Sequence, residues 1–413
     1  MIPGDSPASF NLQRDTTPDT IYDYYARFRE ADRVARTAPE PPLGEPGLVL
    51  LRHEDVQAGL RDIRLGREVH RLLPPEMTPP AARNTFAEVH ANWMLFRDPP
   101  DHTRLRSTAN LAFTPRHVAA MREPIQALAA RLIDDLTARE EPVDLIANFA
   151  YPLPVLVIAG ILGVPNDDHA KFRDWANVIA AAIDIPVSGL EDFVRRADET
   201  SAALSEYFGW IVAQRREEPR DDLISTLVAV ETVEGKLNDR ELIATLILLL
   251  VAGHETTVNL IGNGTLALLQ HRDQWAALVD DPSLAPNATE ELLRYDSPVQ
   301  LTGRFAMEDA EIAGVTIHPG TWVSLVLGSA NRDPRAFDDP DTLDIRRNVG
   351  RIMSFGMGIH FCLGSPLARL EGELAFGALA RAFPDLRLAT DAPEWRPGLV
   401  LRGLKTLQVH PGG

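Results

Sequence analysis

One segment, residues 239–270, constrains the fold of this chain more than any other. Asn238 can cap a helix that begins at Asp239, and the helical pattern continues to about Gln270. Such a helix would be about 45 Å long. The run Leu242–Ala252 is apolar on every face, yet it has only about half of the ~20 residues needed to cross a bilayer. We therefore expect a buried helix that passes through the middle of the molecule.

The rest of the sequence predicts a mainly α-helical protein with small β-sheets, an α+β class. The helix-rich parts are about 101–300 and 366–383, and the strand-rich parts are about 45–60, 300–330 and 385–413. A length of 413 residues by itself favours two or three domains. Because the helix-rich and strand-rich parts interleave without a repeat or a clear linker, we instead expect a single domain spanning residues 1–413.

Several local patterns make specific predictions about the chain around the central helix. Residues 1–45 predict an irregular arm with one short helix, and residues 66–97 predict a long connection of the kind that forms lids or binding loops. A helix is predicted over about 114–138. The segments 311–317 and 321–327 predict a hairpin.

Charge and composition exclude several classes of function. The chain has 41 basic and 59 acidic residues, and the resulting net charge of −18 argues against nonspecific binding to nucleic acids or anionic membranes. The N-terminus has neither the basic nor the apolar region of a signal peptide. With only one cysteine in addition, we expect a protein of the reducing cytoplasm.

That single cysteine, Cys362, lies in an unusual setting. The run FGMGIHFCLGSP places three glycines around it, and Ser365-Pro366 can open the next helix. The positive end of a helix dipole predicts a lowered pKa for this thiol. One cysteine cannot supply a multi-cysteine zinc or iron–sulfur site. The thiolate is therefore expected to be a nucleophile or an axial metal ligand.

The run FGMGIHFCLG resembles the haem-binding pattern F-G-x-G-x-H-x-C-x-G of the bacterial cytochrome P-450 superfamily at every defined position. The resemblance implies the cytochrome P-450 fold, with the long helix crossing a haem-containing core. It also implies haem b as the cofactor and Cys362 as the proximal thiolate ligand of its iron. Phe355 is then expected to pack over the sulfur, and Gly364 to belong to the same cofactor-binding loop.

The sequence AGHETT at 252–257 lies inside the central helix. Threonines after an acid suit a helix poorly, and in an apolar run Glu255 is expected to be buried or linked to water. Val258 stands where the zinc motif H-E-x-x-H needs histidine, so that motif is excluded. The segment resembles the family's oxygen-activation motif. The resemblance implies that Thr256 hydrogen-bonds dioxygen, that Glu255 relays protons from solvent, and that Gly253 leaves room for O₂.

Glu291 and Arg294 form an E-x-x-R pair on one helix face. Such a pair is usually a surface ion pair worth under ~1 kcal/mol. Its place between AGHETT and the cysteine run resembles the family's E-x-x-R, which implies a buried structural triad with an arginine of the following meander. Arg347 is the candidate third member, and the adjacent Arg346 is the alternative.

Haem propionates need cationic or hydrogen-bonding partners inside a protein. The run DPPDHTRLR offers His102 and Arg106, which are four residues apart and therefore on one helix face. The resemblance implies that these two residues, Arg304 and His360 clamp the propionates.

The implied activity is that of a monooxygenase, which activates O₂ at haem and hydroxylates or epoxidises an apolar small molecule. The candidate substrates are polyketides or macrolides, terpenoids, steroids and fatty acids. By resemblance, the pocket is lined by the 66–97 connection and by mainly aliphatic side chains, namely Leu248, Ala252, Val299, Leu301, Val400 and Leu401.

The resemblance also implies partners. Soluble bacterial members receive electrons from NAD(P)H through a ferredoxin or flavodoxin and its reductase. Such a donor is expected to dock near Cys362, with Arg369 in a local basic patch. We expect a monomer that binds no nucleic acid and does not insert into a membrane.

Three alternatives use the same residues differently. A peroxide-driven peroxygenase does not normally need the Glu255–Thr256 pair. A non-catalytic haem sensor or electron carrier needs no oxygen groove. A cysteine hydrolase needs a histidine base, which His360 cannot easily supply from two residues away.

Overall fold

The structure is a computed structural model that describes residues 10–11, 17–39, 46–72, 84–139, 141–165, 168–180, 190–234, 237–390 and 392–412. Its helices are α2 (Ile21–Ala31), α3 (His53–Arg61), α4 (Thr85–Ala91), α5 (Asp101–Ala109), α6 (Pro115–Ala120), α7 (Arg122–Thr137), α8 (Pro152–Ile161), α9 (His169–Ala180), α10 (Leu190–Glu217), α11 (Leu223–Glu234), α12 (Asp239–Gln270), α13 (Arg272–Asp280), α14 (Ala285–Tyr295), α15 (Leu327–Ala330) and α16 (Ser365–Ala382). Its strands are β1 (Val34–Pro39), β2 (Pro46–Leu50), β3 (Leu65–Gly66), β4 (Val143–Asp144), β5 (Thr302–Ala306), β6 (Ala310–Ile312), β7 (Val315–Ile317), β8 (Trp322–Leu325), β9 (Arg387–Leu388), β10 (Glu394–Trp395), β11 (Leu404–Thr406) and β12 (Gln408–His410).

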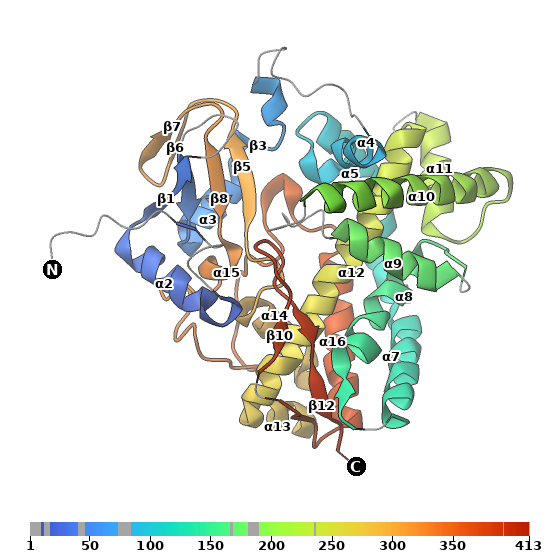
Figure 1. Cartoon of the computed structure of the whole chain (residues 1–413), viewed down its shortest axis with the longest axis vertical. Coiled ribbons are helices and arrows are strands. Elements are labelled where there is room, and N and C mark those ends of the chain that lie inside the picture. Colours follow the sequence, from blue (N-terminus) through green and yellow to red (C-terminus); the bar gives the residue numbers. More distant parts are fainter. Residues whose placement is uncertain are drawn as a thin grey trace.

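Helix α12 runs through the middle of the molecule, as the sequence predicted (Figure 1). Its start is fixed by a capping box: the Asn238 side chain accepts from the Glu241 amide, and the Glu241 carboxylate accepts from the Asn238 amide, each at 3.0 Å. Among the described residues it is the one helix long and apolar enough to span a bilayer, but 78% of its most apolar window is buried inside the protein. The helix is therefore a core element, because packing covers the apolar surface that lipid would otherwise meet.

The largest sheet has five strands in the order β1-β2-β8-β5-β3 and lies beside the helical body (Figure 1). Strand β8 pairs in parallel with β2 and antiparallel with β5. Three smaller sheets, β4-β12-β9, β10-β11 and β6-β7, complete a mainly helical fold with small sheets. The predicted fold class is confirmed, whereas the single-domain organisation stays a prediction.

The predicted hairpin of 311–317 with 321–327 is wrong. Strands β6 and β7 pair with each other through the two-residue turn Ala313-Gly314, and β8 pairs with β5 and β2 instead. Both turn residues have positive φ, 52° and 80°, which matches the twist of a tight hairpin. Alanine rarely adopts this conformation, so the sequence gives little sign of the turn.

Other local predictions need smaller corrections. The arm contains helix α2, but also the edge strand β1, whose terminal proline is tolerated because an edge strand has one unpaired side. The predicted 114–138 helix is broken at Met121 into α6 and α7. The 66–97 connection includes helix α4 and short 3₁₀ turns. The four prolines of this connection fall within residues 73–83, which lie outside the described residues.

Candidate active site

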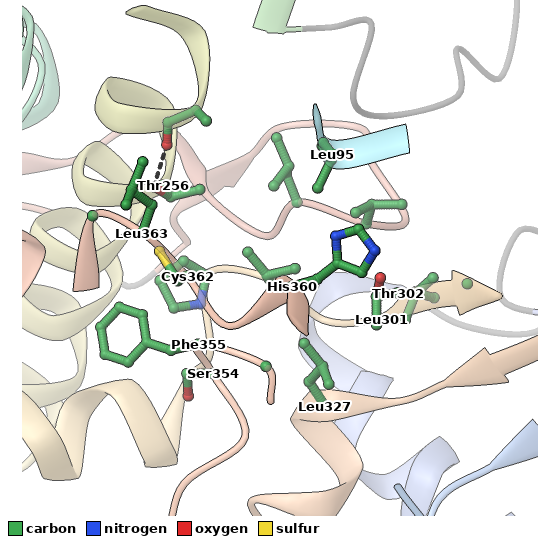
Figure 2. A pocket seen from close by; sticks show the side chains of 18 of the residues that line it. Leu95, Thr256, Leu301, Thr302, Leu327, Ser354, Phe355, His360, Cys362 and Leu363 are labelled. Carbon is green, nitrogen blue, oxygen red and sulfur yellow. Dashed lines mark hydrogen bonds between the residues drawn. The ribbon is translucent and has the colours of Figure 1, made fainter. Parts of the chain in front are cut away.

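A cavity of about 710 Å³ is walled on one side by α12 and on the other by the loop that carries Cys362. Figure 2 shows Thr256 on the helix above this loop, with His360 farther along the loop. The cavity therefore combines the two segments that the sequence singled out, although they are more than a hundred residues apart.

The Cys362 loop owes its shape to two glycines. Gly356 and Gly358 have φ values of 64° and 68°, and a Cβ at Gly358 would lie 2.5 Å from the Leu60 carbonyl oxygen. The tight path brings the Cys362 amide within 2.9 Å of the Phe355 carbonyl oxygen. Phe355, Cys362 and Gly364 all line the cavity. Gly364 is the N-cap of α16, so the sulfur lies just before a helix N-terminus.

The predicted lowering of the thiol pKa is wrong for the protein by itself. Burial raises the pKa of Cys362, and this outweighs the opposing effects of the Gly364 amide, Arg106, Arg369 and the Ser365 amide. A thiol whose pKa is raised is a poor free nucleophile, whereas a metal ion deprotonates a thiol that it binds. The environment therefore favours the axial ligand over the nucleophile.

Basic side chains gather at one end of the cavity. The His102 and His360 rings have centroids 4.4 Å apart, and Arg106 Nη2 donates to the Phe361 carbonyl oxygen at 2.7 Å. Burial, followed by the neighbouring arginines, lowers the pKa of His360 to about 2, and burial lowers the pKa of Arg304 to about 10. The four residues predicted to hold propionates all line this cavity.

Arg67 is a fifth member of this group, and sequence reasoning missed it. Its Nη2 donates to Thr302 Oγ1 at 2.7 Å, and Arg304 Nη1 donates to the same oxygen at 3.1 Å. Burial, and then Arg304, hold the pKa of Arg67 well below its usual value. No motif marks this arginine, because its partner is 235 residues away in the sequence.

The donor set fits haem. His102 and His360 are neutral because burial lowers the pKa of each. Three residues of the group are positively charged, namely Arg67, Arg106 and Arg304. The negatively charged Asp98 carboxylate lies beside them and accepts a hydrogen bond from the Arg67 amide. Two positive charges are left, which the two propionates of one haem would balance. Arg67, His102, Arg106, Arg304 and His360 would hold the propionates, and Cys362 the iron.

Replacing Arg67 by leucine is expected to weaken haem binding by roughly tenfold or more, since one charge-assisted hydrogen bond is lost. The rate of haem transfer to excess apomyoglobin, followed by absorbance, measures the effect. Arg64→Leu is a matched control, because Arg64 pairs with Asp62 and does not line the cavity. Equal transfer rates for Arg67→Leu and the wild type would contradict a propionate role.

On the opposite wall, Thr256 and Gly253 face the cavity. Thr256 Oγ1 donates to the Ala252 carbonyl oxygen at 2.9 Å, so the lone pairs of its hydroxyl stay available as acceptors. A Cβ at Gly253 would make only ordinary contacts, the nearest at 3.6 Å with Ile158. Protein packing therefore does not require glycine there, and the space that it leaves belongs to the cavity.

Glu255 is buried, as expected, but it does not line the cavity. One carboxylate oxygen pairs with Arg396, and the other lies 3.8 Å from His254 Nε2 without a hydrogen bond. The Arg396 amide donates to the Gly403 carbonyl oxygen at 2.9 Å, and its side chain is 31% exposed. The carboxylate is thus connected towards solvent through a residue that the sequence did not single out.

Glu291, Arg294 and Arg347 come together in a buried cluster. Arg294 donates to both Glu291 oxygens at 2.7 and 2.8 Å, and Arg347 Nε donates to Glu291 Oε1 at 3.2 Å. Arg346, the alternative third member, is exposed. Arg294 also donates to the carbonyl oxygens of Asn331 and Pro340, so the cluster ties α14 to the segment 331–347.

All six residues predicted for the substrate pocket line the cavity, and an isolated bridge between Val299 and Leu401 joins two of their segments. The 66–97 connection also contributes, through Arg67, His90, Met94, Leu95 and Phe96.

Arg369 does not form the free basic patch that the docking hypothesis assumed. It pairs with Glu290, and its guanidinium lies 4.4 Å from the centroid of Phe355. Two apolar side chains of the Cys362 loop, Ile359 and Phe361, are exposed.

Comparisons with known proteins agree with this geometry. Residues 283–394 match the profile of the cytochrome P450 family. The chain is 42% identical to a polyketide biosynthesis cytochrome P-450 of Bacillus subtilis, with 88% of this chain and 89% of the relative covered. It is 39% identical to 6-deoxyerythronolide B hydroxylase of Saccharopolyspora erythraea, with coverage of 97% and 99%. A solved cytochrome P-450 (BioI), in complex with an acyl carrier protein that carries hexadec-9Z-enoic acid, superposes with a TM-score of 0.86 at 37% identity, with coverage of 95% and 98%.

Proposed function

Because the chain belongs to the cytochrome P-450 family, we propose that it hydroxylates or epoxidises an apolar small molecule with electrons from a ferredoxin or flavodoxin and its NAD(P)H-dependent reductase. The family is one of haem-thiolate monooxygenases, and Cys362, the single cysteine, binds the haem iron. The observation that carries the proposal is the apolar cavity with Thr256 on one wall and Cys362 on the other. The cytoplasm is the proposed location.

When bound, haem supplies the reductive activation of O₂ and the transfer of one oxygen atom. The chain supplies position and protons. The basic cluster and Cys362 anchor the cofactor, and the apolar walls orient the substrate and exclude water. Thr256 Oγ1 accepts hydrogen bonds while it donates to Ala252, and by turning its hydroxyl it presents a proton to the cavity. Glu255 resupplies that proton from the side that faces Arg396.

The test begins with a screen of apolar compounds for ligand-induced spin-state shifts. Compounds that bind are then incubated with NADH, a surrogate ferredoxin and its reductase under ¹⁸O₂. A product that gains one ¹⁸O atom supports the proposal. Oxygenated product formed only with added H₂O₂ would instead favour the peroxygenase.

Thr256→Ala is expected to lower product formation by about 100-fold while NADH oxidation continues and H₂O₂ accumulates, because the hydroxyl that positions the proton is lost. Product, NADH and H₂O₂ are measured in the same reaction. Thr256→Ser keeps the hydroxyl and should restore most of the product. Product formation by Thr256→Ala at the wild-type rate would remove Thr256 from the proton path.

A further inference from the structure

One polar side chain in the cavity wall has no part in the functions above. His90, in α4, lines the cavity, and its ring stacks on Phe96 with centroids 4.2 Å apart and an interplanar angle of 26°. Phe86 and Trp93 also pack around it, with ring centroids at 5.7 and 5.2 Å. Within the described ranges, neither imidazole nitrogen makes a hydrogen bond. Three aromatic rings therefore hold the imidazole in place and leave its polar atoms for something in the cavity.

The charge state of this imidazole restricts what it can bind. Burial lowers the pKa of His90 to about 4, so the ring is neutral at pH 7. A neutral imidazole offers one donor and one acceptor. It can pair with a hydroxyl or a carbonyl group, but it lacks the positive charge that makes pairing with a carboxylate strong.

The arginines of the cavity are committed elsewhere. Arg67 and Arg304 donate to Thr302, Arg106 donates to the Phe361 carbonyl oxygen, and all three belong to the basic cluster that fits the propionates. Phe96 contacts both groups, since the Arg67 guanidinium lies 5.7 Å from the ring on which His90 stacks. The cavity residues nearest His90 in sequence, Met94 and Leu95, are apolar. Among the described cavity residues of the 66–97 connection, His90 is therefore the polar group that the basic cluster leaves for a substrate.

We propose that His90 anchors a neutral oxygen function, a hydroxyl or carbonyl group, on an otherwise apolar substrate. This inference rests on the proposed function and narrows its substrate class. It favours alcohols and ketones of the polyketide, terpenoid or steroid type over fatty acids, whose carboxylate would call for a cation. A substrate oxygen that pairs with a His90 ring nitrogen adds one neutral hydrogen bond, whereas a hydrocarbon in its place would leave that nitrogen unpaired and cut off from water.

Three ligands with one carbon skeleton test this in the haem-loaded protein, namely farnesol, farnesene and farnesoic acid. Dissociation constants are measured by spin-state titration. The wild type is expected to bind farnesol about 3- to 10-fold more tightly than either of the others, the range for one neutral hydrogen bond. His90→Phe keeps the aromatic stack and should bring farnesol to the level of farnesene without changing farnesene. His90→Gln keeps a donor and an acceptor and should restore part of the preference.

Phe86→Leu is the matched control, because it disturbs the same aromatic group and should shift all three constants by a similar factor. Tightest binding of farnesoic acid by the wild type would overturn the proposal in favour of a carboxylate substrate. An equal loss for all three ligands in His90→Phe would overturn it in favour of a packing role.

A crystal structure of the substrate-free haem protein provides a measurement that does not depend on the ligands chosen. An ordered water within hydrogen-bond distance of a His90 ring nitrogen supports the anchor, and a ring nitrogen bonded to another protein atom contradicts it. The CO-difference spectrum of reduced His90→Phe separates this inference from the proposed function. A retained thiolate-type band with lost preference for farnesol means that only the anchor has been removed.

Discussion

Cys362→Ser is expected to remove the red-shifted Soret band of the reduced, CO-bound protein and to lower O₂-dependent oxygenation by about three orders of magnitude or more. Serine nearly matches cysteine in shape, so the loop should keep its path through the Cys362 amide and the Phe355 carbonyl oxygen. The effect is therefore electronic: a hydroxyl does not donate the electron density that a thiolate supplies to haem iron. The CO-difference spectrum and product formation measure the two losses.

The control is Ile359→Ala, an exposed position in the same loop, which should leave the band unchanged. The chain has no second cysteine that could replace Cys362. A thiolate-type band that persists in Cys362→Ser would therefore overturn the assignment of the ligand.

Arg294→Ala is expected to destabilise the protein by about 3–5 kcal/mol, because it leaves the fully buried Glu291 carboxylate with much of its charge uncompensated. Three backbone carbonyl oxygens, those of Asn331, Pro340 and Thr342, lose a donor at the same time. The free energy of unfolding in urea, followed by circular dichroism, measures the cost.

Arg346→Ala is the natural comparison, since Arg346 is exposed and lies next to the third member of the cluster; its stability should change little. The double variant Glu291→Gln, Arg294→Met should cost less than the sum of its two single substitutions, because neither partner is left as an isolated charge. Additive costs would show that Glu291 and Arg294 act independently.

The parts of the fold that the sequence predicted well are those in which local chemistry and packing agree. Helix α12 carries its own capping box, and its all-round apolar run has only one low-energy location, the core. In the Cys362 loop, glycine stands at two positions with positive φ, so the residue type and the backbone conformation agree.

Prediction failed where a distant partner decides the outcome. Arg396 meets Glu255 across 141 residues, and no spacing rule connects them. The thiol pKa of Cys362 was mispredicted because the helix N-terminus is a local feature, whereas burial depends on the whole fold. The hairpin prediction at 311–327 failed because of a local conformation. Ala313 has a positive φ, which alanine disfavours, so its residue type does not indicate the turn between β6 and β7.

Glu255 and Arg396 are 141 residues apart in the sequence, so their contact forms late during synthesis. Four residues follow all the others of the site in the chain, so a ribosome produces them last, namely Arg396, Leu399, Val400 and Leu401. The haem cradle and α12 are already made when they emerge. Until this late segment docks, the nascent chain has the buried Glu255 carboxylate without its counter-ion and the cavity without one part of its wall. A chain stalled just before Arg396 would contain Cys362 and the basic cluster that fits the propionates, but it would lack the Arg396 counter-ion and the last residues of the cavity wall.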